Sequence, residues 1–104
     1  MAADTLHIPV PVHRLRHHEG FRALTSRERG AYLLSLCLLT HPDPASPLHG
    51  CLCTGELPMT LEEWGREVGE SNRAPATRLW KRLFDLNLLE WHHHDGRPYP
   101  RLTV

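Results

Sequence analysis

The chain has 104 residues, with twelve basic and twelve acidic side chains, so its formal charge is zero. This length leaves room for one domain with a small core, and the balanced charge counts against a protein that binds polyanions over its whole surface. The three cysteines are an odd number, which argues against a disulfide framework and favours a reducing compartment. No apolar run follows a basic one at the N-terminus, and the longest apolar run, residues 31–39, is too short to span a bilayer. We therefore expect a cytoplasmic, nucleoid-associated protein without a membrane partner.

Residues 1–20 are predicted to form an extended basic arm that precedes a domain of residues 21–104. Val10 and Val12 alternate with prolines, a pattern typical of extended chain. Arg14 and Arg16 make the arm basic, which suits contacts to the DNA backbone or minor groove. A solvated tail, or a strand laid across the domain, is the alternative interpretation.

A first helix is predicted from a capping box, in which Thr25 is the N-cap and Glu28 follows three residues later. It should run to residue 39 or 40. Because its interior is apolar nearly all round, we expect it either to be the central buried element or to pack against neighbours on two sides, with another protomer as a candidate for the second side. Cys37 lies in this run and is expected to be a small buried side chain.

Residues 41–56 are predicted to be a Pro-rich loop, long enough to suggest function or mobility. His49, Cys51 and Cys53 are candidate metal ligands, since zinc binds imidazole and thiolate groups. However, the cysteine pair has Cys-x-Cys spacing rather than the Cys-x-x-Cys of structural zinc sites, and there is no second pair. We therefore predict no metal or other cofactor, with zinc as the rival hypothesis. A short strand is expected at residues 55–59, leading into the next helix.

A second helix is predicted from the capping box of Thr60 and Glu63, and Gly69 should end it. Met59 and Trp64 are placed to pack against each other across its N-terminus. The remaining face is mostly acidic and would repel phosphate. We therefore expect it to point away from DNA.

A third helix is predicted over residues 73–86, after a turn at 70–72 and with Pro75 in its first turn. Four basic residues and one acidic residue lie on it, whereas the second helix region has four acidic residues and one basic. The zero net charge thus conceals two oppositely charged helices. The face opposite its apolar stripe is expected to carry Arg73, Thr77, Arg78, Lys81 and Arg82.

The chain is predicted to end in a β-hairpin. Asn87 suits the left-handed residue that ends a helix, and Asp95-Gly96 is a strong two-residue turn signal between two strands. Pro98 and Pro100 should confine the second strand to the edge of a sheet.

This order of elements, together with the string LWKRLFDLNLLE, resembles the winged helix-turn-helix domain. The string FRALTSRERGAYLLSL is similar to N-terminal domains of phage and plasmid replication initiators, and more loosely to small transcriptional regulators. The chain departs from the family pattern in having Asn87 where glycine is usual, and in its long 41–56 loop. The resemblance implies an α+β, mostly α fold of three helices, a short strand after the first helix and a C-terminal hairpin wing.

The resemblance and the basic third helix together predict sequence-specific binding of double-stranded DNA through the helix 73–86 and the wing 88–103. The predicted DNA-binding residues are Asn72, Arg73, Thr77, Arg78, Lys81, Arg82 and Arg97, with Arg14 and Arg16 on the arm. We expect a small regulator of transcription or of replication initiation that has a protein partner in such a complex. A homodimer should form through the first helix or the arm.

The alternative function is a protein-interaction adaptor that does not bind DNA, because this fold also serves that purpose. An enzyme is not predicted. The sequence contains no nucleophile elbow, phosphate-binding loop or paired carboxylates.

Overall fold

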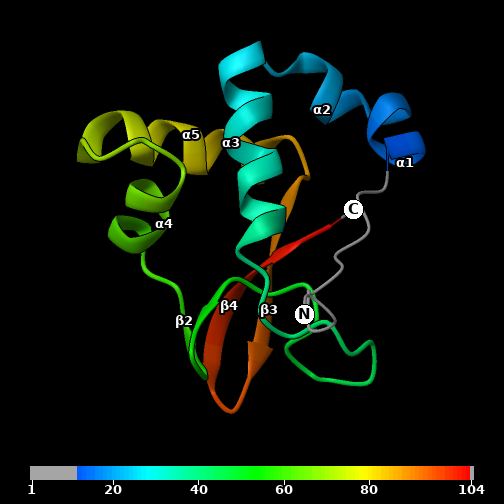
Figure 1. Ribbon diagram of the computed structural model, residues 1–104, viewed down its shortest axis with the longest axis vertical. Coiled ribbons are helices and arrows are strands. Elements are labelled where there is room, and N and C mark those ends of the chain that lie inside the picture. The colour runs from blue at the N-terminus through cyan, green and yellow to red at the C-terminus, as the bar shows by residue number, and fades with distance from the viewer. Residues whose placement is uncertain (1–11, 104) are drawn as a thin grey trace, which may run out of the picture.

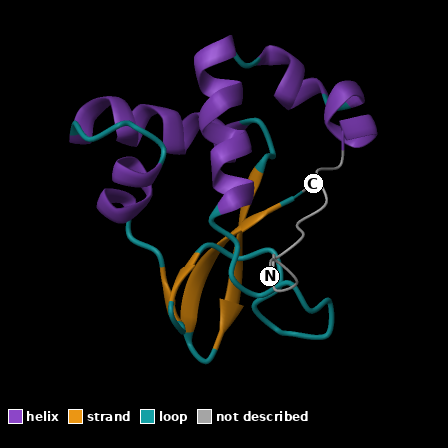
Figure 2. Cartoon of the chain, in the orientation of Figure 1, coloured by secondary structure: helices purple, strands orange, loops and turns teal. Residues whose placement is uncertain are grey.

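The structure, a computed structural model, describes residues 12–103 and is α+β. A central helix is flanked by helices on both sides, and two small antiparallel sheets lie at one end (Figure 1, Figure 2). In this part of the chain no helix is long and apolar enough to cross a membrane. In chain order the elements are α1 (Val12–His17), α2 (Glu19–Ala23), α3 (Ser26–Cys37), β1 (Cys53–Thr54), β2 (Leu57–Pro58), α4 (Leu61–Glu67), α5 (Arg73–Asp85), β3 (Leu89–His94) and β4 (Arg97–Leu102).

Helix α3 is the central element and begins at the predicted capping box. The Thr25 hydroxyl accepts from the Glu28 amide at 3.2 Å, and the Glu28 carboxylate accepts from the Thr25 amide at 2.8 Å. The helix ends at Cys37, earlier than predicted, because the next amides bond three residues back and tighten the chain. Cys37 is exposed, so the prediction that it is buried was wrong. Leu33 and Leu34 also remain 39% and 46% exposed.

The prediction of an extended arm was wrong over residues 12–20, and residues 1–11 lie outside the described part of the chain. Residues 12–17 form α1, and α2 follows after His18, whose Nδ1 accepts from the Phe21 amide at 3.2 Å. Leu15 is buried in the core. A Cβ atom at Gly20 would lie 2.2 Å from the Leu86 carbonyl oxygen, so α2 approaches the end of α5 closely only because this residue is glycine. These tertiary contacts select helix over extended chain.

Helix α4 is joined to α3 through a buried hydrogen bond. The indole Nε1 of Trp64 donates to the Ser35 hydroxyl at 2.8 Å, and that hydroxyl donates to the Ala31 carbonyl at 2.9 Å. The predicted capping box of Thr60 and Glu63 is present at the start of α4. Both partners of the bond lie fully inside the core, so the indole is satisfied where water is absent.

The predicted hairpin is confirmed. Asp95 and Gly96 both have positive φ, at 50° and 74°, as a type I′ turn requires. Asn87 has φ of 59°, and its carbonyl accepts from the Thr103 hydroxyl. The register therefore runs from His94 opposite Arg97 to Leu89 opposite Leu102.

The prediction that β4 is an edge strand is confirmed, because β3 and β4 form a two-stranded sheet. Residues 50–52 nevertheless contact the outer side of β4 through one isolated bridge, Cys51 with Arg101. The Leu52 amide donates to the Pro100 carbonyl at 2.8 Å, and the Leu102 amide donates to the Gly50 carbonyl at 2.9 Å. A proline is tolerated there because its carbonyl is still an acceptor. The long loop is thus folded onto the hairpin, with a small separate core of Leu48, Cys51, Cys53 and Tyr99 beneath it.

Candidate nucleic-acid interface

The basic side chains of α5 are placed by its buried stripe. Ala76, Leu79 and Leu83 face the core and fix the rotation of the helix. On the α4 side, Trp80 packs edge-on against Trp64, with ring centroids 4.9 Å apart. The side chains left exposed on α5 are Arg73, Ala74, Thr77, Arg78, Lys81 and Asp85.

The first turn of α5 is close to the acidic start of α4. Arg73 forms an ion pair with Glu62, with Nη1 and Oε1 2.7 Å apart. The Thr77 hydroxyl donates to the Arg73 carbonyl at 2.8 Å. Asn72 occupies the N-cap position but makes no side-chain cap hydrogen bond. The expectation that the acidic face points away from DNA stays a prediction, but one member of that face, Glu62, lies beside a predicted DNA contact.

Arg78 and Lys81 are the uncommitted cations of this face. Both are exposed, and within residues 12–103 neither side chain makes a hydrogen bond or an ion pair. They are three residues apart on one helix and therefore neighbours on its surface. An anionic ligand could contact both without displacing an internal partner.

Arg82 does not belong with the outward group. Its Nε lies 2.9 Å from the Glu28 carboxylate, and its Nη2 donates to the Ala23 carbonyl at 2.8 Å. Burial raises the pKa of the Glu28 carboxyl, but hydrogen bonds from Thr25 and the ion pair with Arg82 outweigh it and leave that pKa lowered. Arg82 thus ties α5 to α2 and α3. Its side chain is still 41% exposed, and its role as a DNA contact stays a prediction.

The hairpin contributes one uncommitted cation at its tip. Arg97 is exposed immediately after the turn, and no ion pair of this residue is present in the described part of the chain. Of the adjacent histidines, His93 is exposed, and His94 Nε2 lies 3.4 Å from the Asp95 carboxylate.

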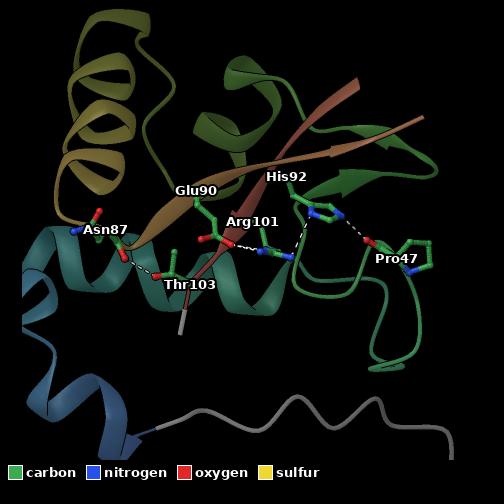
Figure 3. A network of polar contacts seen from close by, with 6 residues as sticks. All are labelled: Pro47, Asn87, Glu90, His92, Arg101 and Thr103. Atoms are coloured by element: carbon green, nitrogen blue, oxygen red, sulfur yellow. Dashed lines mark hydrogen bonds and ion pairs between the residues drawn. The ribbon is translucent and has the colours of Figure 1, made fainter. Parts of the chain in front are cut away.

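A polar network fastens the long loop to the hairpin (Figure 3). His92 Nε2 donates to the Pro47 carbonyl at 2.9 Å, while its Nδ1 accepts from Arg101 Nη1 at 3.3 Å. Arg101 in turn pairs with Glu90 across the strands. Since one ring nitrogen donates and the other accepts, the contacts specify the neutral Nε2–H tautomer of His92. Arg101 is therefore committed to internal partners.

Arg14 and Arg16 are separated from the α5 surface. They lie on α1, and α1 and α2 are on the opposite side of α3 from α4 and α5 (Figure 1). The structure does not bring them together with Arg73 or Lys81.

The candidate metal ligands are not gathered into a site. Cys51 and Cys53 are buried, whereas His49 is exposed, with its Nδ1 3.1 Å from the His41 carbonyl oxygen. Burial raises the pKa of both thiols, to about 11 for Cys53, which opposes the thiolate that zinc binds. Among residues 12–103, no group of three or more histidine, cysteine, aspartate and glutamate side chains is arranged to hold a metal ion.

Two relationships were missed from the sequence although a signal existed for each. The Asp-Gly turn fixes the hairpin register, and that register places Glu90 opposite Arg101. The alternation along β3 also puts Trp91 on the same face as Leu89, where Trp91 stacks on Phe84 of α5 with ring centroids 4.6 Å apart. Trp91 is still 51% exposed beside the α5 surface.

Comparisons with protein-family models, with curated proteins and with solved structures gave no match to this chain.

Proposed function

We propose that the chain is a winged helix-turn-helix domain that binds double-stranded DNA, with α5 as the recognition helix and the β3–β4 hairpin as the wing. It would act as a small regulator of transcription or of replication initiation. The observation that carries the proposal is the pair Arg78 and Lys81, exposed on α5 and without an internal partner.

The order of the elements supports the fold assignment. A central helix α3, a short strand segment, the pair α4 and α5, and a terminal hairpin follow one another in the order that a winged helix requires. One isolated bridge, Cys51 with Arg101, and two backbone hydrogen bonds join the long loop to the outer side of β4, which suits a wing attached to the rest of the domain.

In the proposed complex the exposed side of α5 enters the major groove. Arg78 and Lys81 contact guanine edges or phosphates, and Asn72 and Thr77 offer polar groups to bases or phosphate. Arg97 reaches a phosphate from the hairpin tip. Arg73 is already in an ion pair with Glu62. It would contact DNA only if that ion pair breaks or if its guanidinium group binds Glu62 and a phosphate together.

Binding of a labelled mixed-sequence duplex tests the proposal. Wild-type affinity should fall steeply as salt rises, because each phosphate contact releases counterions. Replacing Arg78 and Lys81 together by alanine should weaken binding roughly tenfold or more and lower the salt slope by about two. The matched control is the double replacement of Arg22 and Arg66 by alanine, which removes the same charge from α2 and α4.

Equal effects of the two double variants would refute the assignment of α5 as the recognition helix. If the wild-type chain retains no duplex even at low salt, the adaptor function replaces DNA binding. The expected homodimer through residues 31–39 or the basic arm stays a prediction, which light scattering over a range of concentrations tests.

A further inference from the structure

A groove with an apolar wall is lined by residues of α1, α2 and α3. Helices α1 and α2 lie on the other side of α3 from α4 (Figure 1). Its volume is about 500 Å³. Val12, Leu15, Phe21 and Leu33 form the apolar part of its lining. Val12 is 65% exposed and Leu33 is 39% exposed, so apolar surface faces solvent along the rim. A groove of this size accommodates the side chains of a short peptide segment.

The rest of the lining is three arginines, Arg16, Arg22 and Arg29. Arg29 is held in place, since its Nε donates to the Phe21 carbonyl at 3.3 Å and its Nη2 donates to the Arg22 carbonyl at 3.0 Å. Its guanidinium also lies 5.4 Å from the centre of the Phe21 ring. Arg16 and Arg22 are exposed, and neither has an ion pair within the described part of the chain.

The groove is therefore cationic as well as apolar. No aspartate or glutamate is among its lining residues within residues 12–103, so the charge of the arginines is not neutralised there. A second copy of the chain docked groove to groove would bring the two sets of arginines together, which is unfavourable. A nucleic acid backbone would meet the arginines but would leave the apolar wall uncovered.

We propose that this groove binds an acidic, amphipathic segment of a partner protein. The apolar side chains of the segment would cover Leu15, Phe21 and Leu33, as an amphipathic helix does when it occupies a hydrophobic groove. Its carboxylates would pair with Arg16 and Arg22, whose planar guanidinium groups suit two-pronged contacts to carboxylate. Arg29 supplies a preorganised positive charge beside them.

This surface is independent of DNA binding. The groove and α4 lie on opposite sides of α3, and α2 contacts only the end of α5, so in the proposed complexes one molecule would hold an acidic partner and a duplex at the same time (Figure 1). Charge reversals on the two surfaces can therefore be tested separately in the same chain.

Selection from a random-peptide display library, with the full-length chain as bait, tests the proposal. Enriched peptides should combine several carboxylates with apolar residues at helical spacing. The strongest of them, made synthetically, should shift amide resonances in α1, α2 and the first half of α3. Replacing Arg16 and Arg22 together by glutamate should lower the affinity for that peptide about tenfold or more. Leu33→Ser should also weaken it, without any change of charge.

The matched control is Arg78→Glu combined with Lys81→Glu, which makes the same charge change on α5 and should leave peptide affinity unaltered. Thermal unfolding of each variant establishes that it is folded. Four results overturn the proposal. The selection enriches no peptide, or it enriches peptides without net negative charge. The two charge reversals weaken peptide binding equally, or duplex DNA instead of the peptide shifts the amide resonances of the groove. Two further results would overturn the proposal. If the groove resonances shift with protein concentration, a second copy of the chain occupies the groove. If residues 1–11 contact the groove, the chain itself occupies it.

Discussion

Arg73 and Glu62 join the first turn of α5 to the first turn of α4 through an ion pair with Nη1 and Oε1 2.7 Å apart. The pair is exposed, so it contributes little to stability, on the order of 1 kcal/mol or less. Its consequence concerns binding, because Glu62 places a negative charge where the proposed duplex would approach.

Glu62→Gln should raise affinity for duplex DNA roughly threefold to tenfold, because it frees Arg73 and removes a charge that repels phosphate. The unfolding temperature should change little. The control is Glu67→Gln on the same helix, which has no ion pair in the described chain. If both variants raise affinity equally, net charge alone is responsible and Arg73 does not contact DNA.

Gly65→Ala should destabilise the protein, because a Cβ atom there would lie 2.6 Å from the Glu70 carbonyl oxygen and 3.3 Å from the Ala76 Cβ. We expect a loss of about 1–3 kcal/mol, since the obstacle is backbone that cannot move freely. Gly30→Ala on α3 is the matched control. It meets no atom within 4 Å and should stabilise the helix by about 0.5–1 kcal/mol. Chemical denaturation measures both, and a neutral Gly65→Ala would contradict this account of how α4 and its turn pack.

Thiol labelling should distinguish the three cysteines. Cys37 is exposed, whereas Cys51 and Cys53 are buried and burial raises the pKa of both thiols. The pKa of Cys53 is raised to about 11, so at pH 8 almost no reactive thiolate forms in the folded protein. A thiol reagent should modify one cysteine rapidly in the native protein and all three in denaturant. Rapid modification of a Cys37→Ser variant without denaturant would show that the small core beneath the loop opens readily.

Acid should weaken the start of α3. The pKa of the Glu28 carboxyl is lowered below its ordinary value of 4.5, since hydrogen bonds and the Arg82 ion pair outweigh the effect of burial. A lowered pKa in the folded state stabilises the fold at pH values above the unfolded pKa. That stabilisation is lost as the pH falls through the folded value. Glu28→Gln should therefore cost about 1 kcal/mol at pH 7, and the cost should shrink as the pH falls below 4.5 and through the folded value. Unfolding curves at several pH values measure the difference, and a pH-independent cost would contradict the assignment.

His92 should determine whether the long loop stays on the hairpin. His92→Ala removes the hydrogen bond to the Pro47 carbonyl and the acceptor for Arg101. We expect a loss of about 1 kcal/mol and faster hydrogen exchange at the Leu52 amide, which bonds to Pro100. His93→Ala, an exposed neighbour on the opposite face, is the control. Equal exchange rates in the two variants would mean that the loop is held by its buried side chains alone.

The elements predicted correctly from the sequence are those specified by residues close together in the chain. The capping boxes at Thr25 and Thr60 and the Asp-Gly turn each involve only a few neighbouring residues, and all three are present. Asn87 likewise adopts the left-handed conformation expected at the end of a helix.

The elements missed depend on contacts between distant residues. Helix α2 is held against the end of α5 at Gly20 and Leu86. Residues 50–52 form hydrogen bonds with β4, which lies about half the chain length away in sequence. The candidate site divides in the same way. Helical spacing put Arg78 and Arg82 on one basic helix, but only the fold brings Glu28 and Ala23 to Arg82 and leaves Arg78 outward. Periodicity identifies an exposed face, and it does not identify which of its charges are already paired.

The two prolines of β4 have a consequence for self-association. On the side of β4 that receives residues 50–52, Pro98 and Pro100 have no N–H group to donate. The pairing there ends beyond Leu52, and β1 and β2 form a separate small sheet. A strand from another molecule that approached this side near Pro98 would likewise find no donor. A continuous backbone ladder between copies is thus interrupted along this side of β4, which is one way that a small hairpin limits pairing at an exposed edge.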